Sequence, residues 1–193
     1  MTPIPIGDAK RALRQDVRAR MKELTPARRA EASAQARTLL AQQTRWRSAQ
    51  SILFFAPMPG ELDLWPLLAE ALAAGKTAAL PRYDAPTQSY RACRIENTAE
   101  DLEMGHFGIR EPNLRCAVDS LDRFNFILVP GVAFDVHGRR LGRGKGFYDR
   151  LLATVRGTTC GVAFDEQLVS EIPVEQHDIR LNCLLTPTCW REV

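Results

Sequence analysis

The first part of the chain has the periodicity of an amphipathic helix. After Asp8, apolar side chains recur at three- and four-residue intervals, at Leu13, Val17, Met21 and Leu24. Side chains at this spacing share one face of an α-helix. The pattern therefore predicts a helix whose apolar face packs against the rest of the protein.

A second helix is predicted directly after the first. Thr25 suits the N-cap because its hydroxyl can accept a backbone N–H, and Pro26 suits the first helical position because it has no N–H to satisfy. The segment 26–43 is rich in Ala, Gln and Arg. We expect its inner edge at Ala30, Ala34 and Leu39. No glycine- and serine-rich linker follows, so both helices are expected to pack on the same core as the remainder.

From Ser51 onwards the pattern changes to short apolar segments typical of buried strands. Pro57 and Pro59 end the first of these segments, and Pro81 closes the second. The stretch 97–123 is polar and rich in turn-forming residues. The predicted strands cover residues 51–55, 77–80, 89–95, 124–129, 158–163 and 183–186, and the predicted helices cover residues 62–74 and 146–155.

This order of elements defines the expected fold class. Strands that alternate with helices favour a mostly parallel sheet that is covered on both faces. We therefore predict an α/β fold, a three-layer α/β/α sandwich with a mostly parallel sheet. A length of 193 residues fits one ordinary domain, so residues 1–193 are predicted to form a single domain.

Composition narrows the class of protein. Hydrophobic residues make up 45% of the chain and charged residues 25%, values typical of a soluble globular protein. No apolar segment is long enough to predict a membrane span, and the first residues lack the apolar core of a secretory signal. The five cysteines are scattered and form no CxxC pair, so we expect reduced thiols in a cytoplasmic protein, without a disulfide framework or a zinc site.

The distribution of charge is uneven. Residues 1–47 carry 11 Lys and Arg against 4 Asp and Glu, a net charge of +7, whereas residues 48–193 carry 15 against 19, a net charge of −4. A basic segment can bind nucleic acid, a membrane surface or an anionic small molecule. It can equally be the solvated face of a helix, so charge alone leaves these alternatives open.

A short loop after the most apolar predicted strand carries the strongest chemical signal. The segment Gly142–Gly146 alternates glycine with a cation, because Arg143 and Lys145 separate its three glycines. Glycines let backbone N–H groups approach phosphate oxygens, and the predicted helix that follows adds a favourable dipole. The loop matches neither the Walker A pattern nor the dinucleotide-binding GxGxxG. We interpret it as an anion-binding loop rather than a plain turn.

The sequence around this loop resembles a known family. The segment RRLGRGKGFYDR at 139–150, preceded by VPGVAFD at 129–135, is similar to the signature of the 5-formyltetrahydrofolate cyclo-ligase family. A basic first helix, an acid after the first strand and the PVxxxD segment at 173–178 extend the resemblance over the whole chain. The resemblance implies ATP-dependent cyclisation of 5-formyltetrahydrofolate to 5,10-methenyltetrahydrofolate through a phosphorylated formyl group, with Mg²⁺ and ATP required.

The resemblance also implies roles for particular residues. Lys145 and Arg143 are the expected catalytic cations, and Ala56 and Glu61 are expected to bind the folate. Asp149 and Asp178 are expected to bind Mg²⁺. ATP is expected to bind at Lys10, Arg11, Ala12, Leu13, Arg14, Arg140, Leu141, Gly142, Arg143, Gly144, Lys145, Gly146, Phe147 and Tyr148.

Some of these residues have plainer interpretations. Lys10 and Arg14 share one helix face, yet by themselves they are two solvated cations. Glu61 is also explained as an acid at the start of the helix at 62–74. Asn182 stands where many members have a second acid, although its amide oxygen can still reach a metal. Isolated histidines are more often structural, so no role is assigned to His106, His137 or His177.

Two other functional classes stay open. A relative on the same scaffold would use ATP on a different substrate, and a nucleic-acid-binding module would use the basic N-terminal segment. The second is disfavoured because no RNP-type aromatic cluster or helix-turn-helix pattern is evident. We expect small-molecule partners only, with no nucleic acid and no membrane, and a monomeric protein.

Overall fold

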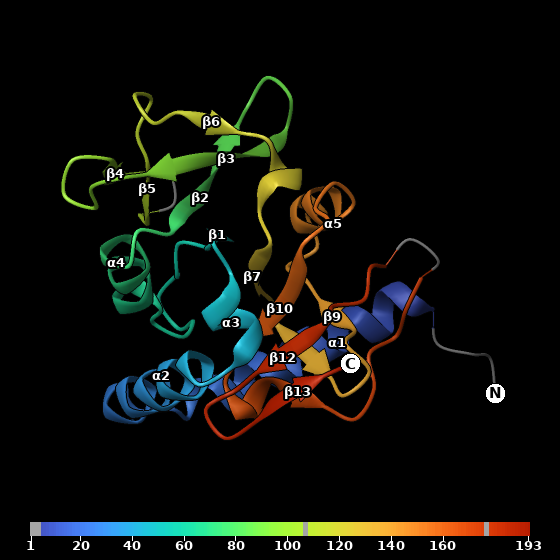
Figure 1. Ribbon diagram of the computed structural model, residues 1–193. Coiled ribbons are helices and arrows are strands. Elements are labelled where there is room, and N and C mark those ends of the chain that lie inside the picture. The colour runs from blue at the N-terminus through green and yellow to red at the C-terminus, as the bar shows by residue number, and fades with distance from the viewer. Residues whose placement is uncertain (1–4, 106–107, 176–177) are drawn as a thin grey trace.

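The fold is built around a twisted central sheet. The computed structural model describes residues 5–105, 108–175 and 178–193. Within this part of the chain the sheet has eight strands in the order β13-β12-β10-β7-β1-β2-β3-β6 (Figure 1). The five strands from β12 to β2 run parallel, and β13, β3 and β6 pair antiparallel at the two edges. The strands are β13 (Trp190–Glu192), β12 (Cys183–Leu185), β10 (Thr158–Val162), β7 (Phe126–Pro130), β1 (Ser51–Leu53), β2 (Thr77–Asp84), β3 (Ser89–Ile95) and β6 (Val118–Asp119).

Helices cover both faces of this sheet. Along β7, Phe126 and Leu128 pack in one core cluster while Ile127 and Val129 pack in another, because successive strand residues point to opposite faces. Residues of α2, α3 and α4 share the first cluster, and α5 shares the second. The prediction of a three-layer α/β/α sandwich is thus confirmed. The helices are α1 (Ile6–Lys22), α2 (Pro26–Ala41), α3 (Thr44–Ser48), α4 (Trp65–Ala73) and α5 (Phe147–Leu152), with short 3-10 turns η1 (Leu121–Arg123) and η2 (Asp165–Gln167).

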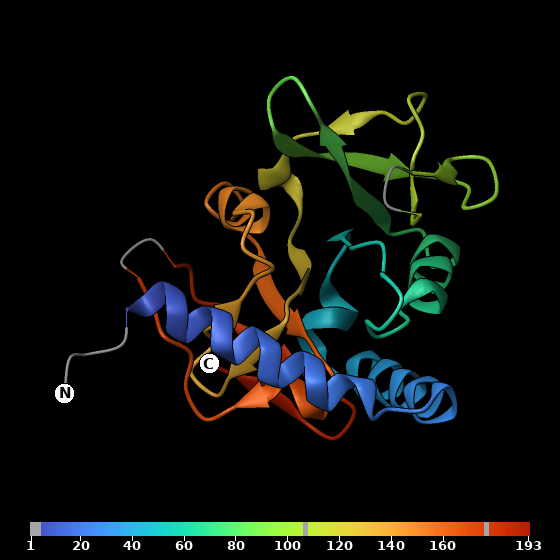
Figure 2. The same cartoon turned by 180° about the vertical axis from the view of Figure 1, so that it is seen from behind.

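The long first helix lies outside the main sheet. Val17 is 1% exposed and packs with Val132, Ala133 and Leu141 in a third core cluster. This cluster joins α1 to a small sheet of β8 (Ala133–Asp135), β9 (Arg140–Leu141) and β11 (Leu168–Val169). Figure 2 shows α1 from behind, crossing the lower part of the molecule. None of the described helices is long and apolar enough to cross a membrane.

The predicted helix start at Thr25-Pro26 is confirmed. The predicted inner edge of α2 is wrong for Ala30 and Ala34, whereas Leu39 is partly buried and packs against the first core cluster. The Thr25 hydroxyl accepts the backbone N–H of Arg28 at 3.2 Å, and α2 begins at Pro26. Ala30 and Ala34 are exposed, and the buried residues of this helix are Ala32, Ser33, Ala36 and Leu40. Alanines occupy several sides of this helix and differ little from their neighbours in size, so their spacing gives a weak signal for the buried face.

The predicted end of the second strand at Pro81 is also wrong. The strand β2 continues to Asp84, and Pro81 pairs with Ala92 of β3. On its other side β2 pairs with β1 only as far as Ala79. Proline lacks an N–H and is tolerated where one side of a strand is unpaired, so Pro81 sits beyond the end of β1 without disrupting the sheet.

The remaining strand predictions hold with shifted ends, and several short strands were not predicted. The predicted strand at 89–95 is confirmed without change as β3. The polar stretch 97–123 contains β6 and a separate hairpin of β4 (Leu102–Met104) and β5 (Arg110–Pro112). Strands of two or three residues carry too few positions for an alternating pattern to be read.

Candidate functional site

The glycine-rich loop follows β7, the central strand of the parallel sheet. After β7 ends at Pro130, the chain forms the β8–β9 hairpin, then the loop 142–146, and then enters α5. Gly144 has a φ of +96° and Gly146 a φ of +67°, a region that L side chains rarely adopt. Gly146 is the N-cap of α5. The loop thus lies at the carboxyl end of the sheet, where open α/β folds bind ligands.

One buried carboxylate fixes the hairpin before this loop. Asp135 is 0% exposed, and one of its oxygens accepts the backbone N–H groups of His137 and Arg139 at 2.9 and 3.1 Å. The other accepts the N–H of Ile172 at 3.0 Å. The aspartate of the VPGVAFD motif therefore has a structural role in orienting the loop, which the sequence alone did not reveal.

A cavity of about 320 Å³ opens beside the loop. Its wall combines the loop with residues at or just beyond the ends of β1 and β7, one residue each from β2 and β3, and the β4–β5 hairpin. Most of the wall is apolar or aromatic, and the charged groups come mainly from the loop side. The lining residues are Ala56, Met58, Glu61, Pro81, Tyr90, Ile109, Glu111, Pro130, Gly131, Arg140, Gly142, Arg143, Gly144, Lys145, Gly146, Phe147, Tyr148 and Asp149.

Aromatic rings form one side of this cavity. The ring centroids of Tyr90 and Phe147 are 5.6 Å apart, and those of Tyr90 and Tyr148 are 5.7 Å apart. Tyr83 extends the cluster at 5.0 Å from Phe147. Burial raises the pKa of Tyr90 and raises the pKa of Tyr148 well above its ordinary value. Both hydroxyls are therefore neutral at physiological pH and present flat surface with a polar edge.

Arg140 is held rigidly at the base of the loop. Its side chain is only 5% exposed and bonds to the Asp149 carboxylate. A second guanidinium nitrogen donates to the carbonyl of Pro130 at 3.3 Å, and the guanidinium lies 5.7 Å from the centre of the Tyr148 ring. These contacts orient one positive charge in the cavity wall.

Glu61 and Arg143 face each other across the cavity wall. Arg143 Nη2 donates to Glu61 Oε1 at 2.8 Å, and the N–H of Met58 donates to Oε2 at 3.0 Å. The Glu61 side chain is 11% exposed, whereas that of Arg143 is 50% exposed. The helix α4 begins only at Trp65 and its N-cap is Leu64. The interpretation of Glu61 as a helix-terminal acid is therefore wrong.

The first helix reaches the loop through one arginine. Arg14 Nε donates to the carbonyl of Gly142 at 2.9 Å. One turn earlier, Lys10 Nζ lies 2.8 Å from both Glu175 Oε2 and Asp178 Oδ2. Burial lowers the pKa of Lys10, but the hydrogen bonds to Asp178 and Glu175 outweigh it and leave the pKa raised. The ammonium therefore stays charged and ties α1 to the C-terminal part of the chain.

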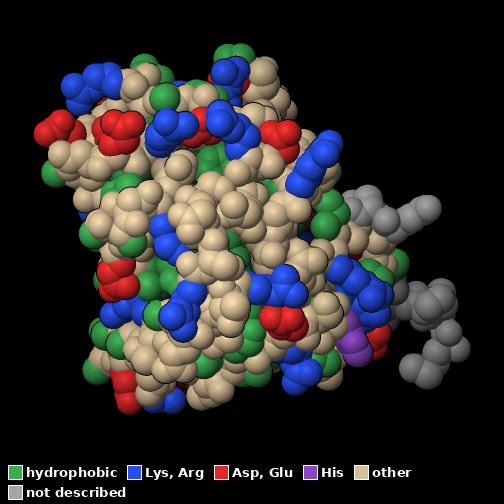
Figure 3. Space-filling view, in the orientation of Figure 1, with side chains coloured by type: hydrophobic (Ala, Val, Ile, Leu, Met, Phe, Trp, Pro, Cys, Tyr) green, Lys and Arg blue, Asp and Glu red, His purple; other side chains and the backbone are tan. Residues whose placement is uncertain are grey.

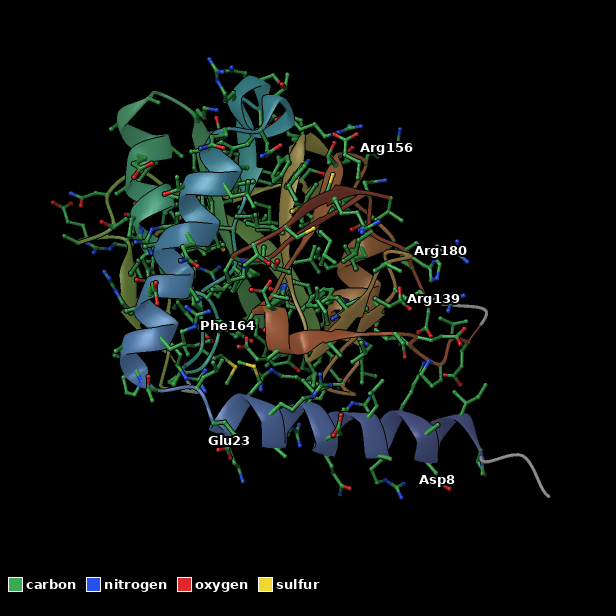
Figure 4. All side chains as sticks on the ribbon, turned by 90° about the horizontal axis from the view of Figure 1, so that it is seen from below. Asp8, Glu23, Arg139, Arg156, Phe164 and Arg180 are labelled. Atoms are coloured by element: carbon green, nitrogen blue, oxygen red, sulfur yellow. The ribbon has the colours of Figure 1, made fainter. Side chains whose placement is uncertain are left out.

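Other residues of this helix point away from the loop. Arg11 and Ala12 are exposed, and Arg11 pairs with Asp8 at 3.0 Å. Leu13 packs against the third core cluster. Figure 4 shows α1 along the lower side of the molecule, with Asp8 and Glu23 towards its two ends. Of the predicted ATP-binding residues in the helix, Arg14 contacts the loop and Lys10 lies one turn away.

The two predicted metal ligands lie in different surroundings. Asp149 lines the cavity and bonds to Arg140, whereas Asp178 binds Lys10 and the N–H of Glu175 and is not part of the described cavity wall. Among the described residues no three acidic, histidine or cysteine side chains are grouped to hold a metal ion. Mg²⁺ needs only one or two carboxylates when phosphate oxygens supply other ligands, so Asp149 fits the role by its position.

Asn182 does not offer its amide oxygen to this site. Its Oδ1 accepts the backbone N–H of Thr159 at 2.9 Å and the Thr159 hydroxyl at 3.0 Å. Both lone pairs are used to join the start of β10 to the segment before β12. The expectation that Asn182 could reach a metal is therefore not supported. His137 is exposed, and His106 and His177 lie outside the described residues.

Several cavity residues were missed from the sequence. Tyr90, Ile109 and Glu111 come from β3 and the β4–β5 hairpin, and no motif marks them. Pro81, which lies within β2, and Pro130, the last residue of β7, also line the wall. At Pro81 the only signal in the sequence was a proline after an apolar segment, which we interpreted as the end of the strand.

Comparison with known proteins agrees with this architecture. Residues 6–187 match the model of the 5-formyltetrahydrofolate cyclo-ligase family. The 5-formyltetrahydrofolate cyclo-ligase of Escherichia coli K12 is 35% identical over 176 residues, covering 89% of this chain and 97% of that protein. The Mus musculus protein of the same name is 28% identical and covers 96% of this chain and 97% of its own.

Solved structures give the same result. The NMR structure of Aquifex aeolicus 5,10-methenyltetrahydrofolate synthetase superposes with a TM-score of 0.85 at 33% identity, covering 95% of this chain and 92% of that one. A Mycoplasma pneumoniae 5,10-methenyltetrahydrofolate synthetase shares the fold, with a TM-score of 0.72 at 21% identity over 92% and 98% of the two chains. The chain belongs to the 5-formyltetrahydrofolate cyclo-ligase family.

Proposed function

We propose that this protein is a 5-formyltetrahydrofolate cyclo-ligase that uses ATP to form 5,10-methenyltetrahydrofolate. The observation that carries the proposal is the composition of the cavity wall. Flat apolar side chains such as Tyr90 and Tyr148 meet the cationic glycine loop Gly142–Gly146 in one space. Such a space suits the bicyclic pterin on one side and a polyphosphate on the other.

The loop is the proposed phosphate site. Its backbone N–H groups and the N-terminus of α5 favour anions, and Lys145 and Arg143 add full charges. Arg14 of α1 donates a hydrogen bond to the Gly142 carbonyl and so adds its positive charge beside the loop. Lys10 and Arg14 of α1 are proposed to lie over the triphosphate, with Glu175 and Asp178 orienting Lys10.

Glu61 is the proposed folate ligand, and Ala56 lines the same pocket. Reduced folates carry several N–H donors, and a carboxylate accepts such bonds with charge assistance. In the structure Glu61 is paired with Arg143. We propose that bound ATP draws Arg143 towards its phosphate oxygens and leaves Glu61 to the folate.

The chemistry begins with the formyl group, an amide whose oxygen is a poor leaving group. The formyl oxygen attacks the γ-phosphorus of ATP, the bond to the bridging oxygen breaks, and ADP leaves. The 10-position nitrogen then attacks the formyl carbon and loses its proton, and the carbon–oxygen bond breaks to release phosphate. Phosphoryl transfer depends mainly on positioning and charge neutralisation. Arg143 and Lys145 are the proposed groups that stabilise the charge that develops on the oxygens.

Mg²⁺, if bound with ATP, would neutralise part of the phosphate charge. Asp149 is the proposed ligand within the cavity, and Asp178 is a second candidate beside Lys10. Binding of Mg²⁺ at Asp149 would require its carboxylate to share or exchange its contact with Arg140.

A nucleic-acid role is not favoured by the surface in view. In Figure 3, Lys and Arg side chains are interspersed with Asp and Glu rather than gathered in one broad basic patch. A nucleic-acid interface is normally marked by clustered basic residues. We propose a cytoplasmic, monomeric enzyme whose partners are ATP and a reduced folate.

The test is a direct assay with purified protein, 5-formyltetrahydrofolate and Mg-ATP. The near-ultraviolet absorbance of the methenyl product should rise only when both substrates and Mg²⁺ are present, with one ADP formed per product. ADP formation with another carbonyl substrate but none with the folate would assign the scaffold to a different reaction. No ATP-dependent product of either kind would contradict the proposed function.

A further inference from the structure

The cavity wall contains a carboxylate that the proposed reaction does not yet use. Within the part of the chain that the structure describes, three carboxylates line the cavity, those of Glu61, Glu111 and Asp149. Glu61 is bonded to Arg143, and Asp149 is bonded to Arg140. These two acids are the proposed ligands of the folate and of Mg²⁺. The third, Glu111, lies on the β4–β5 hairpin and has no assigned role.

The geometry of β5 directs Glu111 into the cavity. Successive residues of a strand point to opposite sides. Arg110 points towards α4, where its guanidinium lies 5.2 Å from the centre of the Trp65 ring, whereas the next residue, Glu111, is partly buried and lines the cavity. A Cβ placed on Gly105 would lie 2.5 Å from both Cδ and Oε2 of Glu111. The glycine therefore leaves the room that this carboxylate occupies.

The base of the hairpin is anchored just beyond Glu111. Asn113 is 7% exposed. Its backbone N–H donates to the carbonyl of Asp101 at 2.8 Å, and its side-chain amide donates to the carbonyl of Glu100 at 2.7 Å. Arg82 of β2 donates to the Asn113 carbonyl. These contacts join β5 to the main sheet, so the strand that carries Glu111 can hold a side chain in a fixed place in the wall.

Glu111 also lies close to one of the rings that form the flat side of the cavity. Burial is the main cause of the raised pKa of Tyr90, and the negative charge of Glu111 contributes more to it than the charge of Glu61 does. The carboxylate of Glu111 and the hydroxyl of Tyr90 therefore face the same space. Because the pterin is proposed to stack in this space, Glu111 lies at the edge of the bound folate.

We propose that Glu111 is the general base that removes the proton from the 10-position nitrogen during ring closure. The inference rests on the proposed function, in which this nitrogen attacks the formyl carbon of the phosphorylated intermediate. As the new carbon–nitrogen bond forms, the nitrogen becomes positively charged and its proton passes to the Glu111 carboxylate. The electron pair of the N–H bond returns to the nitrogen, and the carbon–oxygen bond breaks with its electron pair to release phosphate. Glu111 then loses the proton to solvent.

The test follows the two halves of the reaction separately in Glu111→Gln, which keeps the shape of the side chain but removes the base. Rapid quenching measures ADP, and near-ultraviolet absorbance measures the methenyl product. In the wild type the two products should form together. In the variant, ADP should form in the first turnover within about twofold of the wild-type rate. Methenyl formation should slow by roughly 10²–10⁴-fold, the usual contribution of a positioned base.

A matched variant and a matched substrate separate this role from a general effect on the site. Glu103 is exposed and lies directly opposite Glu111 in the hairpin, outside the described cavity wall. Glu103→Gln removes the same charge and should keep both rates. A 5-formyl folate with a CH₂ group at position 10 can undergo only the first half of the reaction. It should yield ADP at equal rates in the wild type and in Glu111→Gln.

Methenyl formation at the wild-type rate in Glu111→Gln, or an equal slowing of ADP and methenyl formation, would overturn the proposal. If Glu111→Gln does not fold, Glu111→Asp decides, because its shorter carboxylate should slow methenyl formation alone; equal or absent effects on the two halves overturn the role. Failure of the proposal is distinct from failure of the proposed function. A wild-type protein that forms no methenyl product refutes both, whereas one that forms it and keeps the two halves matched in the Glu111 variants refutes only this role.

Discussion

Replacing Glu61 by Gln is the perturbation that best separates folate binding from nucleotide binding. The substitution keeps the size of the side chain and removes its charge. In the structure this side chain is 11% exposed and contacts Arg143 and the N–H of Met58. The amide oxygen of Gln can still accept from Met58, whereas its NH₂ group is a poor partner for Arg143.

The structure gives different magnitudes for stability and for binding. An ion pair whose arginine is half exposed contributes about 0–1 kcal/mol, and 1 kcal/mol shifts the melting temperature of a domain of this size by about 2–4 °C. A charge-assisted hydrogen bond to the folate is worth about 1.5–3 kcal/mol. At about 1.4 kcal/mol per tenfold, this predicts a roughly 10- to 150-fold weaker affinity for the folate. The affinity for ATP should not fall, because Glu61 is not part of the loop and loss of its charge releases Arg143 for the phosphate oxygens.

Equilibrium titrations with 5-formyltetrahydrofolate and with a non-hydrolysable ATP analogue measure both affinities directly. Glu31→Gln is the matched control, since Glu31 forms an exposed ion pair with Arg28 and does not line the cavity. It should leave both affinities unchanged. An unchanged folate affinity in Glu61→Gln would refute the folate role, and equal losses for both ligands would indicate a distorted site.

Three further predictions concern the loop, the metal and the thiols. Lys145→Met should lower kcat by roughly 10²–10³-fold, as expected for loss of one preorganised donor, with ATP still bound; near-normal turnover in a stopped-flow assay would contradict this role. Asp149→Asn should raise the Mg²⁺ concentration needed for half-maximal activity, and Asp178→Asn should do the same if both carboxylates contact one ion. A double variant that needs no more Mg²⁺ than the wild type would exclude a shared metal. In native protein at pH 7.5 a thiol reagent should modify the partly exposed Cys116 and Cys189 before the buried thiols, whose pKa values burial raises: Cys93, Cys160 and Cys183. Equal reaction rates for all five thiols would be inconsistent with the burial of these three.

The sequence predicted the elements whose signals are local. Thr25 and Pro26 predict the start of α2 because helix capping depends on two adjacent residues. Gly144 and Gly146 indicate the loop because its positive φ angles favour glycine. The family resemblance identified Glu61 as a candidate folate ligand. The alternative interpretation, that Glu61 is an acid at the start of a helix, is excluded only by the structure, in which α4 begins at Trp65.

The parts that sequence could not predict depend on contacts between distant segments. Pro81 stays inside β2 because the shorter neighbour β1 ends earlier, which no local pattern reveals. Tyr90 and Ile109 reach the cavity only through the pairing of β2 with β3 and through the β4–β5 hairpin. The pairing of Lys10 with Asp178 joins residues 168 positions apart, so their spacing in the sequence carries no signal.

The central claim is that the formyl oxygen leaves as phosphate, and oxygen labelling tests it most directly. The protein is supplied with Mg-ATP and 5-formyltetrahydrofolate that carries ¹⁸O in the formyl group, and the released phosphate is analysed by mass spectrometry or by ³¹P NMR. Attack of the formyl oxygen on the γ-phosphorus predicts one ¹⁸O atom in each phosphate formed with product. Unlabelled phosphate, with the ¹⁸O found in water, would contradict a phosphorylated formyl intermediate.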